Sequence, residues 1–562
     1  IGNQFVINFK PISRLSLNSN STETYKGHIV DITGKSVFPG VIVVKNGVIS
    51  DIIRIDSVEE NAPYYLPALT DAHIHIESSM MTPVNFAKVA VCHGVINAVC
   101  DPHEIVNVLG IAGLDFMIGN AKDSRFKFFF GLPSCVPSSH LETAGANIDA
   151  NMTREYIRRD DIYFLAEMMN YPGVIAEDKE VIGKIDAALQ AGKKIDGHAP
   201  GIKGDDLRKY AEAGISTDHE CSTVEEARER IKNGIKVIVR EGSAARNFDA
   251  LYSIIAESPE MVMLCSDDKH PDDLVAGHID ALVRRGIAKG ISVWDILQAA
   301  CINPVNHYKL PVGLMRKGDN ATFIAVDNLV DFNVVSAIID GYLVYDSKNG
   351  LIDHNLTVND SINVMPNNFE AEPITLQDIF LDTSKGCAKV IVAVDGELLT
   401  DKEIVPVEEL SDPEIQKIVV YNRYGNGKPP VGFIKGFNIS NGAIGATIAH
   451  DSHNIVAIGS SDQYLVKIIN ALIGYKGGVG VVSDDETDIF PLPVAGLMSH
   501  EPANTIAENY NRINAKTKSL GCKLKAPFIT MAFMALPVIP ELKLTDKGLV
   551  DVSRFDFVDV IN

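Results

Sequence analysis

Short apolar runs that end in polar, chemically reactive residues recur along the first half of the chain. Each run is long enough for one strand, and most stop at histidine, aspartate or glutamate side chains. Strands of this kind build α/β barrels, in which the active site lies at the carboxyl ends of the strands. Eight such runs occur, at residues 66–75, 94–104, 126–137, 162–170, 193–201, 214–220, 235–243 and 261–268.

The segments between these runs carry apolar residues at helical spacing. Alternating strand and helix patterns predict parallel βαβ units, and two further helical segments after the eighth run would close the barrel. The predicted fold class is therefore α/β, with a (β/α)8 TIM-like barrel over residues 66–315. The helical segments are 81–94, 180–193, 204–214, 223–234, 270–290 and 292–308.

Strand patterns also flank the barrel on both sides. β-branched runs separated by Gly, Asn and Asp occupy residues 25–65, and similar runs return at 321–329 and 336–346. We expect residues 1–65 and 316–360 to pair into one small β-sandwich domain built from both flanks.

A polar stretch at 355–368, which contains Pro366, marks the boundary of a further region. Residues 369–562 mix strand and helix patterns, with apolar runs such as 389–394 and 454–460. We expect an additional C-terminal α+β domain there.

The charge balance restricts the class of partner. The 562 residues include 51 Lys and Arg against 73 Asp and Glu, which gives a formal net charge of −22. Nucleic-acid binding needs a basic surface, so a small-molecule substrate is the better expectation. No apolar stretch is long enough to span a bilayer, residues 1–17 lack the order of a signal peptide, and the eight cysteines form no CxxC pair. We expect a cytoplasmic protein without a membrane partner.

Imidazoles and carboxylates gather at the predicted strand ends in a pattern that indicates a metal site. The first run ends in an HxH pair, and alternate residues of a strand point to the same face. Alone, such a pair could be two ordinary polar residues. However, several other runs also end in a histidine, aspartate or glutamate at the same position relative to the apolar residues. The predicted ligands are His73, His75, Glu167, His198, His219 and Asp267.

This mixture of nitrogen and oxygen ligands suits a divalent transition metal such as Zn, Mn or Fe(II). Two ions are plausible, with Glu167 placed to bridge them. Bound metal would make hydroxide available near neutral pH, and Asp267 is then the natural base and proton carrier. Asp268 is an alternative ligand that the sequence does not exclude, although a helix cap or a supporting acceptor is the expected role for it.

With these residues in place, the chain resembles the adenine deaminase family of the amidohydrolase (metallo-dependent hydrolase) superfamily. The resemblance implies hydrolysis of adenine to hypoxanthine and ammonia in purine salvage, Mn²⁺ or Fe²⁺ as the usual metal with Zn²⁺ possible, two ions per active site, and a homo-oligomer. It covers nearly the whole chain. The segments that carry it include DAHIHIESSMMTP, CDPHEIVNVLG, AEMMNYPGVI, CSDDKHPDDL and GFIKGFNISNGAIGATIAHDSHNIVAIG.

Two residues after the second run, His103 and Glu104, are candidates for the chemistry. His103 could act as an acid or base or contact the leaving group, and otherwise it is a core or capping histidine. Glu104 could bind a purine ring nitrogen or cap a helix, and the sequence favours neither.

Arg240, Glu241 and Ser243 end the seventh run and could contact the edges of a purine. An Arg–Glu pair is also often structural. In the C-terminal region, His450 lies in the segment AHDSHN, where polar groups follow an apolar run as they do at a strand end. Together with Asp451 and His453 of the same segment, it could cover the barrel mouth, bind a further metal or cap a helix; we expect a contribution near the pocket, with His450 as a substrate contact.

Three other functions are less consistent with the sequence. A cyclic-amide hydrolase of the same superfamily usually carries a carboxylated lysine on the fourth strand, where this chain has Glu167; a related aminopurine remains an alternative substrate. A nucleic-acid deaminase would need a PCxxC motif that is absent from the sequence. A non-enzymatic scaffold would be expected to lack a ligand, and each expected ligand type is present.

Overall fold

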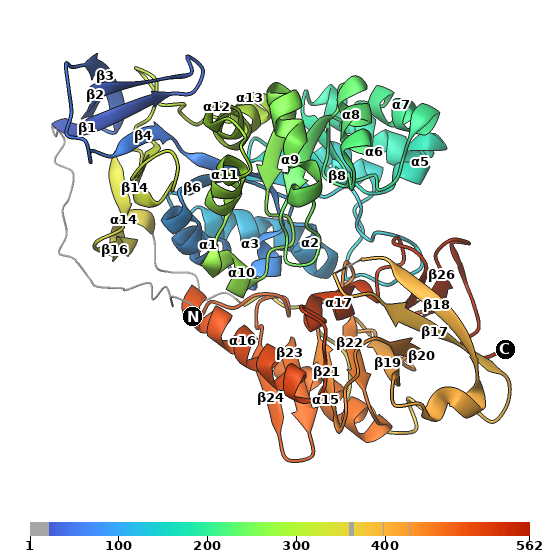
Figure 1. Ribbon diagram of the computed structural model, residues 1–562. Coiled ribbons are helices and arrows are strands. Elements are labelled where there is room, and N and C mark those ends of the chain that lie inside the picture. The colour runs from blue at the N-terminus through green and yellow to red at the C-terminus, as the bar shows by residue number, and fades with distance from the viewer. Residues whose placement is uncertain (1–21, 359–364, 397, 426) are drawn as a thin grey trace.

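The computed structural model describes residues 22–358, 365–396, 398–425 and 427–562. Residues 1–21 and 359–364 lie outside the described residues. They include the start of the expected small β domain, the N-terminal segment compared with a signal peptide, and the middle of the 355–368 boundary. Figure 1 shows a barrel with the small β domain on one side and the C-terminal domain, orange to red, beneath it.

Eight parallel strands form the barrel, in the order that the sequence predicts. Continuous strand pairing divides them into a five-stranded and a three-stranded sheet, and backbone hydrogen bonds join the two sheets. Ser216 donates its N–H to the Ile195 carbonyl (2.9 Å), and Asp267 donates to the His73 carbonyl (3.0 Å). The strands are β5 (Leu69–Ile74), β6 (Val95–Cys100), β7 (Lys127–Leu132), β8 (Ile162–Met168), β9 (Lys194–Gly197), β10 (Thr217–Asp218), β11 (Lys236–Arg240) and β12 (Val262–Cys265).

Helices surround the barrel because each carries one apolar face. In α6, for example, Val181, Ile185 and Ala188 are buried at positions i, i+4 and i+7, and Asp178 caps the first turn by accepting from two backbone N–H groups. The main helices are α1 (Pro83–Ala90), α2 (His103–Leu109), α3 (Ile111–Ala121), α4 (Ala150–Tyr156), α5 (Tyr171–Ile175), α6 (Lys179–Gln190), α7 (Gly204–Glu212), α8 (Val224–Lys232), α9 (Phe248–Glu257), α10 (Pro271–Ala276), α11 (Ile279–Ala288), α12 (Val293–Leu297) and α13 (Asn303–Tyr308).

The barrel interior is apolar at one end and polar at the other. Side chains from strands on both sides of the barrel, such as Phe164 of β8 and the neighbouring Ile238 and Met263 of β11 and β12, belong to one apolar cluster inside it. Two residues further along their strands, the inward positions become polar: Ile238 is followed by Arg240, and Cys265 by Asp267. The packed end therefore acts as a rigid base for the polar end.

The two flanks of the barrel pair as expected, in one eight-stranded sheet. β4 joins them, since it runs parallel to β1 and antiparallel to β13. The strands are β1 (Thr22–Asp31), β2 (Ser36–Lys45), β3 (Val48–Arg54), β4 (Tyr64–Pro67), β13 (Phe323–Val326), β14 (Val334–Ile339), β15 (Tyr342–Asp346) and β16 (Gly350–Leu351), and the short helix α14 (Asp353–Leu356) follows.

The C-terminal region forms the additional domain that the sequence predicts. An eight-stranded, mostly antiparallel sheet carries helices, and a three-stranded sheet packs beside it. The elements are β17 (Cys387–Ala393), β18 (Thr400–Pro406), β19 (Ile415–Tyr421), β20 (Val431–Lys435), β21 (Gly442–Ala446), β22 (Ile455–Gly459), α15 (Asp462–Tyr475), β23 (Gly478–Ser483), β24 (Thr487–Pro491), α16 (Ala503–Ser519), α17 (Pro527–Phe533), β25 (Leu542–Thr545), β26 (Gly548–Asp551) and β27 (Asp556–Phe557).

This domain packs on the polar end of the barrel. The Ser499 N–H donates to the Met80 carbonyl (2.9 Å), just after β5, and the Asn454 side chain donates to the Thr143 carbonyl (2.9 Å), after β7. Within the described part of the chain, no helix is both long and apolar enough to cross a membrane.

Candidate metal centre

The HxH pair lies at the carboxyl end of β5, and its two imidazoles face each other. The Nε2 atoms of His73 and His75 are 3.1 Å apart. The other ring nitrogen of His75, Nδ1, lies 3.0 Å from the Asp101 carbonyl and donates to it. A neutral His75 therefore presents the lone pair of its Nε2 atom to the centre, as a metal ligand does.

Glu167, at the end of β8, lies in the middle of the cluster. Its Oε2 atom is 3.0 Å from His198 Nδ1 and 3.1 Å from His219 Nε2. Its Oε1 atom faces the other side, 3.6 Å from His75 Nε2. The two oxygens of one carboxylate thus face two different groups of imidazoles.

Asp267 completes the ring of predicted ligands. Its Oδ1 atom lies 3.5 Å from His73 Nε2 and 3.3 Å from His75 Nε2. Asp268 points elsewhere and accepts a hydrogen bond of 2.6 Å from the Ser78 hydroxyl. The structure therefore brings Asp267, and not its neighbour, to the histidines.

The donor set fits a divalent metal. Burial alone would raise the pKa of the Glu167 and Asp267 carboxyls, but the imidazoles around Glu167, and Arg240 together with imidazoles around Asp267, hold both pKa values well below the usual range. Ionised carboxylates and imidazole nitrogens in one buried cluster are the ligands that Zn, Mn and Fe(II) prefer. Several triads of these atoms lie within 4.8 Å of one another.

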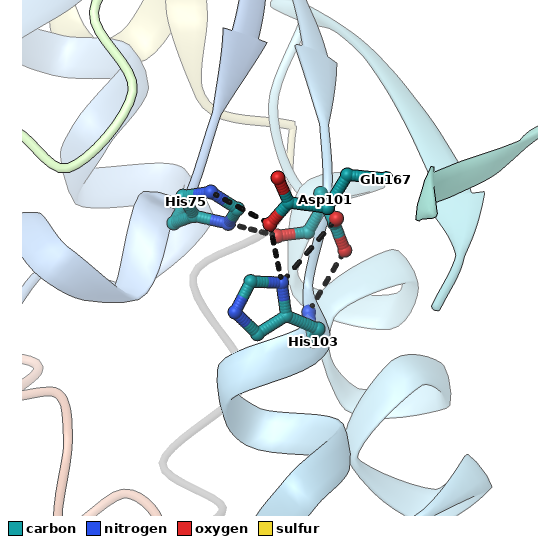
Figure 2. A group of neighbouring side chains, drawn as sticks. All are labelled: His75, Asp101, His103 and Glu167. Carbon is teal, nitrogen blue, oxygen red and sulfur yellow. Dashed lines mark hydrogen bonds and ion pairs between the residues drawn. The ribbon is translucent and has the colours of Figure 1, made fainter. Parts of the chain in front are cut away.

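His103 stands beside this cluster, at the start of α2 (Figure 2). Its Nδ1 atom is 3.3 Å from both Glu167 Oε1 and Asp101 Oδ2, and its Nε2 atom is 3.2 Å from Glu104 Oε1. His103 thus links the central carboxylate to Glu104. Sequence reasoning missed Asp101, although it ends the second apolar run in the same way that the predicted ligands end theirs.

Arg240 is also brought to the centre, together with a residue that the sequence analysis missed. Its guanidinium donates to Asp267 Oδ2 (2.9 Å) and pairs with Glu220. Glu220 Oε1 lies 3.4 Å from His219 Nε2 and 3.5 Å from His198 Nδ1. The available signal was its place directly after His219 at a strand end.

Glu241 and Ser243 make contacts away from the metal-ligand cluster. The Glu241 carboxylate pairs with Arg285 of α11. The Ser243 hydroxyl donates to Asp273 Oδ2 (2.7 Å) at the start of α10. Both side chains hold loops of the barrel together.

The C-terminal domain reaches the centre through the segment AHDSHN. His450 Nδ1 lies 2.7 Å from Glu104 Oε1, and His453 Nε2 pairs with Glu104 Oε2. Asp451 Oδ1 is 3.9 Å from His103 Nε2. The sequence pattern predicted that His450, Asp451 and His453 contribute near the pocket, but nothing in it shows that His453 faces a residue 349 positions earlier.

A parallel barrel with imidazoles and carboxylates at its strand ends defines a metal-dependent hydrolase of the amidohydrolase class. Residues 64–344 match the model of the amidohydrolase family, and residues 394–556 match the model of the adenine deaminase C-terminal domain. The chain therefore belongs to the adenine deaminase family, and the superfamily fold implies that the buried cluster is a metal centre.

Curated relatives resemble the chain over almost its full length. An adenine deaminase of Methanosarcina mazei is 48% identical over 95% of this chain and 99% of its own, and one of Sulfurovum sp. is 45% identical over the same shares. Among solved structures, a beta-aspartyl dipeptidase from Fervidobacterium islandicum AW-1 aligns with a TM-score of 0.45 at 16% identity, over 59% of this chain and 98% of its own.

Proposed function

We propose that this protein hydrolyses adenine to hypoxanthine and ammonia at a centre of two divalent ions, as a step of purine salvage. The observation that carries the proposal is the meeting of the six predicted ligands from β5, β8, β9, β10 and β12 in one buried cluster. The relatives named adenine deaminase supply the substrate. The proposed ligands are His73, His75, Glu167, His198, His219 and Asp267.

Glu167 is the residue proposed to lie between the two ions, because its two oxygens face different imidazoles. Mn²⁺ or Fe²⁺ is the proposed metal, with Zn²⁺ as the alternative. When bound here, a divalent ion would lower the pKa of water towards neutral and so make hydroxide available.

Asp267 is the proposed proton carrier. It would take a proton from water as the water oxygen bonds to the ring carbon bearing the amino group, and it would give that proton to the amine nitrogen as the C–N bond breaks. Arg240 Nη1 binds the Oδ2 atom of Asp267 at 2.9 Å and keeps the carboxylate in one orientation.

Glu104 and His103 are proposed to serve the purine ring. The pKa of Glu104 lies well below its usual value, because the imidazoles of His450, His453 and His103 outweigh the effect of burial. An ionised Glu104 can only accept hydrogen bonds, so it suits an N–H group of the purine. His103 Nε2, 3.2 Å from Glu104 Oε1, supports that carboxylate.

Metal-stripped protein should show how many ions the reaction needs. We expect ammonia release from adenine to rise with added Mn(II) or Fe(II) and to level off near two ions per chain, measured by coupled ammonia assay and elemental analysis. The same titration of the Asp267→Asn variant should yield little ammonia. Metal-loaded wild-type protein that releases none would exclude adenine and direct attention to related aminopurines and cyclic amides.

A further inference from the structure

Glu104 is held by side chains from another domain. It lies in the first turn of α2, on the barrel, and both of its carboxylate oxygens face imidazoles of the C-terminal domain. Glu104, His450 and His453 are 1%, 2% and 1% exposed, so the polar partners of this carboxylate are the imidazoles and not bulk solvent. A buried carboxylate needs such partners to remain ionised.

The tautomer of His453 follows from its second contact. The backbone N–H of Ala449 donates to His453 Nδ1 at 3.3 Å, so that nitrogen carries no proton. The proton of a neutral ring then sits on Nε2, which donates to Glu104 Oε2. Burial lowers the pKa of His453 despite the nearby carboxylate, in agreement with a neutral ring.

His450 acts through the opposite ring nitrogen. Its Nδ1 atom lies 2.7 Å from Glu104 Oε1, and its ring stacks on Phe533 of α17 with centroids 4.5 Å apart and planes at 15°. The ring is thus held flat against a fixed aromatic surface, with Nδ1 in close ion-pair contact with the carboxylate.

The loop that carries these histidines is itself braced. Tyr424 donates its hydroxyl to the Ser452 carbonyl (2.5 Å), and Asn454 Oδ1 accepts from the Arg423 N–H (3.1 Å). Asn454 also donates to Thr143 of the barrel (2.9 Å). Contacts on both sides fix the loop relative to α2, as a positioning element requires.

We propose that His450 and His453 are positioning residues that fix Glu104 as the hydrogen-bond acceptor for the purine ring, so that two domains together form the adenine pocket. The inference rests on the proposed function, because it assigns a role to Glu104 in substrate binding. It gives the C-terminal domain a part in recognising the substrate, in addition to covering the barrel.

Amide side chains can test which ring nitrogen each histidine uses. The amide nitrogen of asparagine replaces a histidine Nδ1 atom, and that of glutamine replaces Nε2. We expect His453→Gln and His450→Asn to keep most of the adenine affinity. We expect His453→Asn and His450→Gln to raise KM for adenine roughly 10-fold or more with little change in kcat, since a polar contact with a charged group is lost.

Binding without turnover gives a second measurement. Hypoxanthine affinity can be measured by calorimetry on metal-loaded variants. It should be kept in His453→Gln and His450→Asn and weakened in His453→Asn and His450→Gln, while metal content and Tm stay near the wild-type values. His453 has a φ of 55°, a backbone conformation that asparagine tolerates well, so strain would not explain a loss in His453→Asn. His307→Gln is the control. This buried histidine contacts Ser216, which precedes β10, whereas the proposed ligand His219 follows β10 at the other end of the strand.

The outcomes separate the two proposals. Wild-type turnover of adenine with equal KM values for all four variants would overturn the positioning role and leave the proposed function standing. A metal-loaded wild-type enzyme that neither binds nor deaminates adenine would overturn the proposed function and, with it, the role of Glu104. A change in kcat alone, at constant KM and hypoxanthine affinity, would also contradict the inference.

Discussion

The fully buried cationic side chains of the barrel and of the C-terminal domain have different kinds of partner. In the barrel, Arg230 is fully buried and pairs with Asp218 at 3.0 Å. In the C-terminal domain, Lys543 is equally buried, but its Nζ atom donates to a neutral acceptor, the Leu398 carbonyl, at 3.0 Å. Arg423 likewise donates to amide and carbonyl oxygens of Asn367 and Asn368.

The pKa values follow the same division. Burial tends to lower the pKa of Arg230, but the neighbouring Asp218 outweighs this effect and raises it. Lys543 has no such partner among the described residues, and burial lowers its pKa to about 7. Asp218 is next to the proposed ligand His219, and Arg230 also binds the carbonyls of Ala199 and Ile202 after β9. The Arg230–Asp218 pair therefore supports the loops of the metal centre, while Lys543 and Arg423 of the C-terminal domain are held by neutral hydrogen bonds.

The largest expected effect concerns the two adjacent aspartates of the barrel. Asp267→Asn should lower kcat for adenine by roughly 10²–10⁴-fold, because the proton carrier is lost. Asp268→Asn should lose less than about 10-fold, since Asp268 bonds to Ser78 and not to the histidines. Steady-state ammonia assays at matched metal content would check this, and equal losses in both variants would contradict the assignment.

Removing the barrel's buried cation should strongly reduce stability. Arg230→Met leaves Asp218 without its partner, and a broken buried pair costs about 3–5 kcal/mol. Chemical denaturation would measure the free energy of unfolding. If the double variant Asp218→Asn with Arg230→Met were no more stable than Arg230→Met alone, the unpaired carboxylate would not be the cause.

Removing the buried amine of Lys543 in the C-terminal domain should instead increase the free energy of unfolding. Between pH 7 and 10.5, Lys543 is neutral in the folded protein and protonated in the unfolded chain, so the free energy of unfolding rises with pH by up to about 1.4 kcal/mol per pH unit. Lys543→Met should abolish this slope and raise stability, most clearly at and below pH 7. The measurement is chemical denaturation of both proteins from pH 6 to 10. If the free energy of unfolding of Lys543→Met rose with pH as steeply as that of the wild type, a neutral Lys543 would be excluded.

The smallest effect is expected at the brace of the positioning loop. Tyr424→Phe removes one hydrogen bond, to the Ser452 carbonyl, and should cost about 0.5–1.5 kcal/mol. If the loop fixes Glu104, KM for adenine should also rise modestly. A loss of stability with unchanged KM would show that this bond supports the fold and not the pocket.

The barrel was predictable because each strand combines an apolar run with a polar end. The runs 162–170 and 261–268 became β8 (Ile162–Met168) and β12 (Val262–Cys265), with Glu167 and Asp267 at their ends. Parallel strands bring such ends together whatever the loops do. The family resemblance pointed to the same positions.

Contacts between domains were not predictable in the same way. The pairing of Glu104 with His453 depends on how two separately folded units dock, and no periodicity in either segment encodes that docking. Side-chain direction was a second limit: Glu241 and Ser243 follow Arg240 directly, but only Arg240 turns towards the centre. The positions of these residues along the strand end are similar, so rotamer and loop geometry decide the difference.

The path of the chain through the small β domain also constrains how the protein matures. β4 (Tyr64–Pro67) pairs with β13 (Phe323–Val326), and the entire barrel lies between them in the sequence. During synthesis, β4 must therefore wait for the ribosome to deliver the barrel and then β13. Such non-local pairing forms slowly and leaves strand edges open. Completion of this sheet is thus expected among the last folding events of the first two domains, and β4, although β1 covers one of its edges, keeps its other edge unpaired until then.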